Sequence, residues 1–341
     1  MIQLFQQPFL RRFAAMANAF QQANLNALER GTYTKTPLEV LLEIHRKNRG
    51  ESFFYRLVDR RWILPVTSFL NQCKSLNEDI KEKGIFEGSK RFLEKLGLQL
   101  KVVINRDAKN FLSKNFPLLL IGEHPSALGF DFFALAASMA DISNRTDNFH
   151  FLGWLLARGI IPSFQSWIFP VSVTAEEFGT PPKNHGHFGP FADWVQACAL
   201  PINRYQSARF NKTSIKAFAQ SWINGNRVLL FPDGGTAALP VWRPGLGWIV
   251  IEAVKNLRES QRDFYILFFR VEGANDRMVL NPPLIARYHP FRLIFRPKRK
   301  SMVVRYGTPI HLNELQSTFF NMKPMAVTEL LQKMYKEQFK L

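Results

Sequence analysis

The sequence predicts an α/β fold, in which a mixed, mostly parallel sheet is flanked by helices and preceded by a helical N-terminal region. The chain has 341 residues and is 46% hydrophobic, which is enough for a substantial core. From residue 98 onward, short β-rich runs alternate with helical segments, which is typical of α/β proteins. Residues 37–97 instead have the apolar grouping of helices, and Gly97 is placed to end the last of them, over 86–96.

The predicted strands and helices follow in order along the chain. The run 98–104 alternates and predicts the first strand, and the continuously apolar run 117–121 predicts a second, buried on both faces. An alanine-rich helix is expected at 132–140. Further strands are expected at 227–231 and 264–271, helices at 245–257 and 326–339, and a closing hairpin at 293–296 with 302–306.

These elements suggest three parts. We expect a helical N-terminal region over 1–97, an α/β domain over 98–312, and a C-terminal helix within 313–341 that packs on that domain. The segment 180–211 is rich in Pro, Gly and His and is expected to be an insertion or lid-like loop. Residues 1–28 contain no acid. They predict a terminal helix packed on the body, with an interfacial helix or a targeting segment as alternatives.

The charge and the cysteines restrict partners and location. The formal net charge of +18 favours an anionic partner: nucleic acid, an anionic membrane surface or a phosphorylated substrate. No nucleic-acid-binding motif is present, so nucleic acid is not expected. Cys73 and Cys198 lie far apart in no paired motif, which fits a reducing compartment. Without a secretory signal or a run of ~18 apolar residues, we expect a cytoplasmic protein at the membrane periphery.

The first chemical motif joins the second predicted strand to the helix after it. His124 follows the apolar run 118–121, and Asp131 lies at the start of the helix. A histidine at a strand end can serve as a base, and an aspartate that accepts its other ring N–H fixes the tautomer. The structural alternative is that His124 only caps the strand and Asp131 only caps the helix.

A second motif follows the strand at 227–231. Phe231, Pro232 and Asp233 are followed by Gly234 and Gly235, and glycines after a strand allow backbone N–H groups to approach a ligand closely. Arg243 then precedes Pro244 and Gly245, at the start of a helix whose N-terminus favours a phosphate. Together these residues predict a site for a hydroxylated, phosphorylated ligand.

These two motifs resemble the glycerophospholipid acyltransferase superfamily over roughly residues 98–312. The resemblance implies transfer of a fatty acyl chain from a coenzyme A or acyl-carrier-protein thioester to a hydroxyl of a glycerol-phosphate or lysophospholipid-type acceptor. It implies His124 as general base, Asp131 as its partner, acceptor binding by Asp233 and the two glycines, and Arg243 on the acceptor phosphate. It implies no cofactor beyond the thioester co-substrate, and no metal.

The sequence departs from the family pattern at several positions. Six residues separate His124 from Asp131 where the family has four, and Glu123 stands where the family commonly has Asn. Asp233 replaces a Glu. Gln165 stands where a phosphate-binding arginine is usual, and Arg209 or Lys212 are possible substitutes. The alternative function is therefore a catalytically impaired protein of this fold that binds lipid or a membrane.

Two other constellations are weaker. His185 and His187 with Asp193 lack a clear further ligand, so a metal site is not expected. Ser126 does not lie in the Gly-x-Ser-x-Gly turn of a hydrolase nucleophile. The segment 277–313 has eight basic residues and no acid, interleaved with large apolar residues, and Lys298, Arg299 and Lys300 are expected to meet an anionic membrane surface.

Overall fold

The computed structural model of the protein describes residues 75–114, 116–124, 129–143, 149–154, 161–171, 204–233, 242–257, 263–274 and 301–341. These residues belong to two compact units. One, here called the α/β unit, takes its described residues from 78–152 and 215–341. The second unit takes them from 75–77 and 153–214. The domain boundaries expected from the sequence, after residues 97 and 312, stay a prediction.

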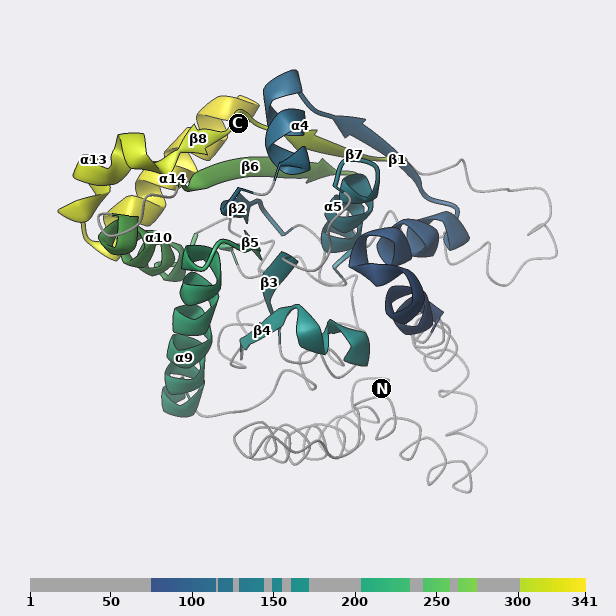
Figure 1. The fold of residues 1–341 in the computed structure, drawn as a ribbon, viewed down its shortest axis with the longest axis horizontal. Helices are drawn as coiled ribbons and strands as arrows, with labels where there is room; N and C mark the ends of the chain where they lie inside the picture. Colours follow the sequence, from purple (N-terminus) through teal and green to yellow (C-terminus); the bar gives the residue numbers. More distant parts are fainter. Residues whose placement is uncertain are drawn as a thin grey trace, which may run out of the picture. The chain divides into compact units, whose positions relative to one another are not determined.

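The α/β unit is built on a mixed sheet (Figure 1). Its strands are β1 (Gln99–Val103), β2 (Leu118–Ile121), β3 (Phe149–Trp154, up to Leu152 in this unit), β5 (Arg227–Leu230), β6 (Tyr265–Glu272), β7 (Ser301–Tyr306) and β8 (Ile310–His311). They lie in the order β1-β7-β6-β2-β5-β3, with β8 beside β6. Neighbours are parallel except that β6 runs antiparallel to β7 and β8. A mixed, mostly parallel sheet is therefore confirmed.

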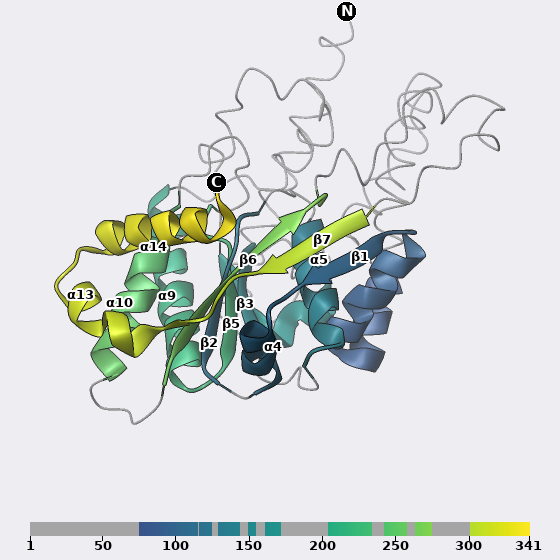
Figure 2. The same cartoon turned by 90° about the horizontal axis from the view of Figure 1, so that it is seen from above.

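Helices cover the sheet on both sides. Figure 2 shows α10 (Gly245–Leu257) and α14 (Pro324–Phe339) on one side and α5 (Phe130–Ala140) on the other. The remaining helices of this unit are α4 (Arg106–Ser113), α13 (Gln316–Phe320), the short η3 (Leu312–Leu315), the helical residues within 78–95 and the end of α9 (Arg204–Ile223). This arrangement encloses the central strand β2, whose four residues are at most 1% exposed.

The second unit contributes the first half of α9, η1 (Pro162–Ser166) and β4 (Ile168–Val171). Within it, the backbone N–H and the hydroxyl of Ser163 both donate to Oδ1 of Asn77, each at 2.8 Å. These bonds join two segments that are distant in sequence.

Most of the predicted elements of the α/β unit are confirmed within a residue or two. The end of the helix before β1 follows the chemistry expected of Gly97. Its φ is +71°, its N–H donates to Glu94 at 2.8 Å, and the N–H of Leu98 donates to Leu93 at 2.9 Å. A residue with positive φ that satisfies the last carbonyls in this way is the usual glycine ending of a helix.

Three expectations need correction. Helix α5 begins at Phe130, two residues earlier than expected, because Gly129 takes a φ of +76° and starts the helix there. Helix α9 begins at Arg204, inside the segment 180–211 that was expected to be an irregular loop. Strand β7 has β1 on one edge and β6 on the other, so both its edges are occupied and the expected hairpin with 293–296 is wrong for β7.

Phenylalanines supply much of the core, as their number predicts. Phe92 stacks beside Phe130 with ring centroids 6.4 Å apart, and it meets Phe133 edge-on at 5.0 Å. Phe268 and Phe269 of β6 are fully buried. Aromatic rings bury a large apolar area each, so the contacts of Phe92 hold the helical residues 78–95 against α5.

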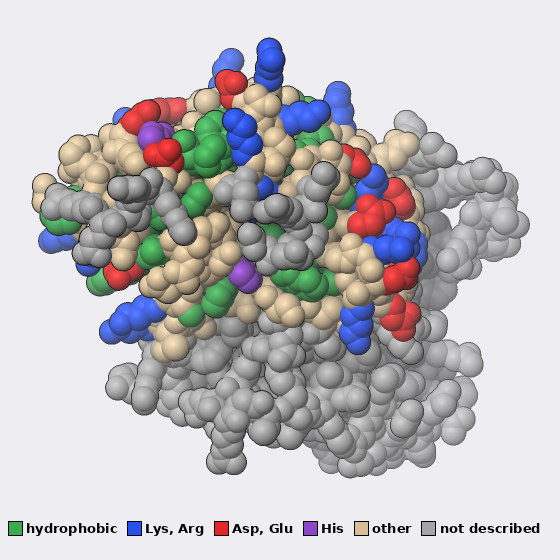
Figure 3. Space-filling model, in the orientation of Figure 1, with side chains coloured by type: hydrophobic (Ala, Val, Ile, Leu, Met, Phe, Trp, Pro, Cys, Tyr) green, Lys and Arg blue, Asp and Glu red, His purple; other side chains and the backbone are tan. Residues whose placement is uncertain are grey.

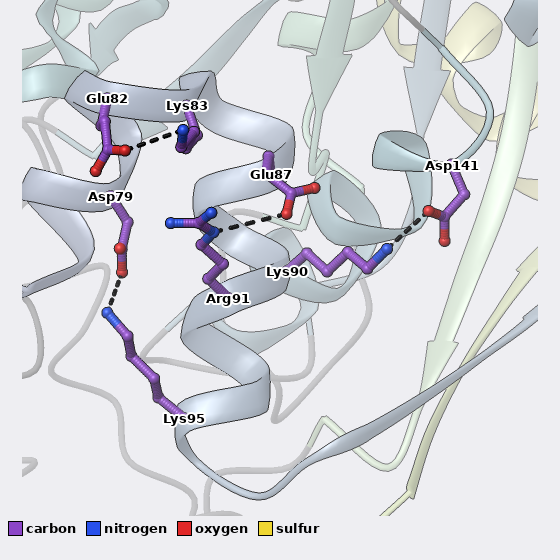
Figure 4. A network of polar contacts seen from close by, with 8 residues as sticks. All are labelled: Asp79, Glu82, Lys83, Glu87, Lys90, Arg91, Lys95 and Asp141. Atoms are coloured by element: carbon purple, nitrogen blue, oxygen red, sulfur yellow. Dashed lines mark hydrogen bonds and ion pairs between the residues drawn. The ribbon is translucent and has the colours of Figure 1, made fainter.

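Several ion pairs involve the helical residues 78–95 (Figure 4). The Nζ of Lys95 contacts Asp79 at 2.5 Å, and that of Lys90 contacts Asp141, just after α5, at 2.7 Å. The second pair is mostly exposed, and the Asp141 contact raises the pKa of Lys90. Exposed pairs of this kind contribute about 0–1 kcal/mol each, so the aromatic contacts and not these ion pairs hold the helix.

Basic side chains on the face drawn in Figure 3 are scattered among acidic ones and form no single patch among the described residues. Lys298, Arg299 and Lys300 lie outside the described residues, as do residues 1–28. Within the described part of the chain, no helix has the length and apolar character to span a membrane.

Candidate active site

The candidate site forms where β2 and β5 end side by side. The two strands are parallel, and Ile121 pairs in register with Leu230. Three residues further along each strand come His124 and Asp233, so the pairing places these two side chains at the same level. Carboxyl ends of parallel strands are where α/β proteins place ligand sites. The register of the sheet thus brings together the two motifs of the sequence.

His124 and Asp131 form the close pair that the sequence predicts. The ring Nδ1 of His124 lies 2.6 Å from Oδ2 of Asp131, despite the six residues between them. The earlier start of α5 places Asp131 in the first helical turn. When the ring is neutral and Nδ1–H donates to the carboxylate, the lone pair is on Nε2, and Nε2 is then the nitrogen that can accept a proton.

Asp131 is a buried carboxylate and is held accordingly. Its side chain is 0% exposed, among the apolar residues of α5. Oδ2 meets the histidine, and Oδ1 accepts the backbone N–H of Phe132 at 2.8 Å. A buried charge is costly unless it is paired and hydrogen-bonded, and these two contacts together with the helix N-terminus offset that cost. Burial therefore fixes the carboxylate and, through it, the plane of the ring.

Asp233 holds the backbone of His124. Its Oδ2 accepts the N–H of His124 at 2.9 Å, and its side chain is only 3% exposed. The resemblance assigns Asp233 to acceptor binding, and that role stays a prediction. The contact adds a positioning role, because it fixes the main chain from which the ring projects.

Aromatic packing completes the support of the ring. The ring of Phe231 stacks on that of His124, with centroids 4.6 Å apart and planes at 25°. Phe231 in turn meets Phe269 edge-on at 5.7 Å. At Gly122, a Cβ would lie 2.5 Å from the Phe269 ring and 2.8 Å from its backbone oxygen. The close approach of β2 and β6 at the site thus requires glycine at position 122.

Arg243 is tied by its main chain to the same strand end. Its N–H donates to the carbonyl of Pro232 at 3.0 Å, and its own carbonyl accepts the N–H of Leu246 as α10 begins. The residue is half-buried. The main chain of Arg243 is therefore next to Pro232, and its role at an acceptor phosphate stays a prediction.

Some predicted site residues are not placed relative to this pair. Gly234 and Gly235 lie outside the described residues, as do His185, His187 and Asp193. Gln165, Arg209 and Lys212 belong to the second unit, so their expected roles stay predictions. Among the described residues, no group of three or more His, Cys, Asp or Glu side chains is arranged to hold a metal ion.

Sequence reasoning missed one neighbour of the histidine. Glu123 was noted only as a departure from the family pattern, yet its half-buried carboxyl lies among charged and polar groups from β6 and α14. The signal that could have found it is its position, directly before His124 and just beyond the end of β2.

Comparison with known proteins gives a structural likeness at low sequence identity. The protein is similar to the crystal structure of the 1-acyl-sn-glycerophosphate (LPA) acyltransferase PlsC from Thermotoga maritima, with 13% sequence identity and a TM-score of 0.31. The likeness covers 73% of this chain and 78% of that chain. No protein-family model matches the sequence, and no curated protein sequence matches it.

Proposed function

We propose that the protein is an acyltransferase that moves a fatty acyl chain from a coenzyme A or acyl-carrier-protein thioester to a hydroxyl of a glycerol-phosphate or lysophospholipid-type acceptor. The observation that supports this most directly is the 2.6 Å contact between Nδ1 of His124 and Oδ2 of Asp131. A carboxylate that accepts the Nδ1 proton fixes the tautomer of the ring, which is what a histidine base at the carboxyl end of the central strand would need.

The reaction requires one base and one site for negative charge. Nε2 of His124 removes the proton of the acceptor hydroxyl as its oxygen attacks the thioester carbonyl carbon. Asp131 stabilises the imidazolium that forms. The tetrahedral intermediate then collapses, the C–S bond breaks, and the imidazolium returns the proton to the leaving thiolate. A positioned base of this type accelerates a reaction by about 10²–10⁴-fold.

Charge in the intermediate and on the acceptor would be met by nearby groups. Backbone N–H groups of the turn before α5, or of its first residues, are candidates for the oxyanion. Arg243 would meet the acceptor phosphate, since a guanidinium pairs with phosphate through two N–H groups. Asp233 and the glycines after it would bind the glycerol hydroxyls. No step in this chemistry requires a metal.

A thiol-release assay tests the proposal. The purified full chain is mixed with acyl-CoA or acyl-carrier-protein thioester, and free thiol is measured with glycerol 3-phosphate, with a lysophospholipid and with no acceptor. The proposal expects release that depends on the acceptor and is absent in His124→Ala. Lipid binding without acceptor-dependent release would instead favour the catalytically impaired alternative.

A further inference from the structure

A row of three residues crosses the sheet just before the histidine. The last residue of β2, Ile121, pairs in register with β5 on one side and with β6 on the other. One residue further along these strands come Phe231, Gly122 and Phe269, in that order across the sheet. His124 lies two residues beyond Gly122. The row therefore has an aromatic residue on each side and a glycine on the central strand.

The glycine allows the two aromatic rings to meet across β2. Neighbouring strands lie about 4.8 Å apart, so the backbones of β5 and β6 are separated by roughly twice that spacing. The rings of Phe231 and Phe269 nevertheless meet edge-on, with centroids 5.7 Å apart and planes at 77°. A Cβ at Gly122 would lie 2.5 Å from the Phe269 ring. A larger residue at position 122 would therefore displace that ring.

Phe231 carries the contact from the core to the histidine. Its ring is half-buried and stacks on that of His124, with centroids 4.6 Å apart and planes at 25°. Phe269, in contrast, is 0% exposed. Side chains in a close-packed core have little freedom to move, so the edge of Phe269 is a fixed surface for the Phe231 ring.

We propose that Phe269 is a positioning residue for His124, acting through Phe231, and that Gly122 leaves the space which this contact needs. The role rests on the function proposed above, because it concerns the base of that reaction. A single hydrogen bond to Asp131 leaves the imidazole free to tilt about that bond. The stacked Phe231 ring opposes the tilt, and Phe269 keeps Phe231 in place.

Two consecutive residues of β6 provide a test variant and its matched control. Phe269→Leu removes the ring edge and keeps an apolar side chain. Phe268→Leu removes the same atoms from a residue that is also 0% exposed. The Phe268 ring instead meets Tyr335 of α14 at 5.7 Å and Trp242 at 6.3 Å, because consecutive strand residues point to opposite faces. Both variants should lose similar stability, so stability alone would not explain a difference at His124.

The first readout is the NMR spectrum of the full chain with labelled histidine, in which His124→Ala identifies the His124 signals. Protons that face a stacked aromatic ring are shifted upfield by its ring current. Phe269→Leu should move the His124 ring protons toward their ordinary position, and Phe268→Leu should leave them in place. Unchanged signals in Phe269→Leu, or equal movement in both variants, would overturn the proposal. If Phe269→Leu does not fold, Phe269→Met, which retains most of the volume without the flat ring, takes its place.

The second readout is acyl transfer. Phe269→Leu should lower kcat about tenfold with little change in either KM, since a misplaced base slows the reaction and leaves substrate binding alone. Phe231→Leu should lower kcat at least as far, and the double variant no further than Phe231→Leu. A raised acceptor KM at unchanged kcat in Phe269→Leu would contradict the positioning role. If the wild type transfers no acyl group, the proposed function fails, and the ring-proton shifts still decide whether Phe269 positions His124.

Discussion

Oδ2 of Asp233 accepts the backbone N–H of His124 at 2.9 Å, although 109 residues separate the two in sequence. The bond joins the ends of two neighbouring parallel strands. Asp131 holds the ring of the same histidine at 2.6 Å. His124 is thus fixed by one carboxylate at its main chain and by another at its ring, which is the preorganisation that a general base needs.

Asp233→Ala should therefore reduce kcat. Loss of the contact releases the main chain of His124, and a misplacement of about 1 Å can cost on the order of 100-fold in rate. Asp233→Asn retains an oxygen acceptor and should be milder. Steady-state kinetics with both substrates measure the effect. A raised acceptor KM at unchanged kcat would instead leave Asp233 with acceptor binding alone.

Arg243→Ala should weaken phosphorylated acceptors more than uncharged ones. A charge-assisted contact contributes about 1.5–3 kcal/mol, so kcat/KM for a phosphorylated acceptor should fall about 10- to 150-fold. A monoacylglycerol of the same chain length serves as the uncharged comparison. Equal losses of kcat/KM on both acceptors would show that Arg243 does not bind the acceptor phosphate. Gln165→Arg is the complementary variant, and it should raise activity with phosphorylated acceptors.

Gly247→Ala should destabilise the packing of α10 on α14. A Cβ at position 247 would lie 1.8 Å from the backbone oxygen of Pro324, so the helices must move apart. Overpacking of this kind costs about 1–3 kcal/mol. Gly245→Ala is the matched control, because its Cβ would meet only the end of Ile215 at 3.4 Å. Urea unfolding measures the stability of both variants. Equal midpoints would show that α10 and α14 move apart without loss of stability.

The sequence predicts the elements whose ends are chemically marked. Helix α10 begins and ends at the expected residues, because Pro244 and Gly245 mark its start and its apolar residues repeat at helical spacing. Strand β2 is continuously apolar and is buried as expected. The predicted start of α5 is two residues too late. A glycine with positive φ precedes the helix, and the composition of the sequence does not determine backbone dihedrals.

The contacts within the site also differ in whether the sequence alone predicts them. The pairing of His124 with Asp131 is predictable, since both lie within one strand-turn-helix motif. The contact between Asp233 and His124 instead depends on the register of β2 with β5, which composition does not determine. Helix α9 was missed because its first half carries Arg204, Asn211 and Lys212 without a continuous apolar stripe.

Binding to anionic vesicles is expected from the basic segment 277–313. Each basic residue near such a surface contributes about 1 kcal/mol, so replacing Lys298, Arg299 and Lys300 with Gln should reduce vesicle binding without unfolding the protein. Co-sedimentation at rising salt measures it, since the screening length falls from about 10 Å at 0.1 M to 3 Å at 1 M. Undiminished vesicle binding by the triple variant would show that another segment makes the membrane contact, with residues 1–28 as the next candidate.

The most direct measurement is the single-turnover rate of acyl transfer by His124→Ala beside the wild type, with the thermal midpoint of each protein as control. His124 is partly exposed at a strand end, with 21% of its side chain accessible, so its removal should leave the fold intact. We predict a fall in rate of about 10²–10⁴-fold, with Asp131→Asn intermediate. Near wild-type turnover in His124→Ala would contradict the proposed mechanism.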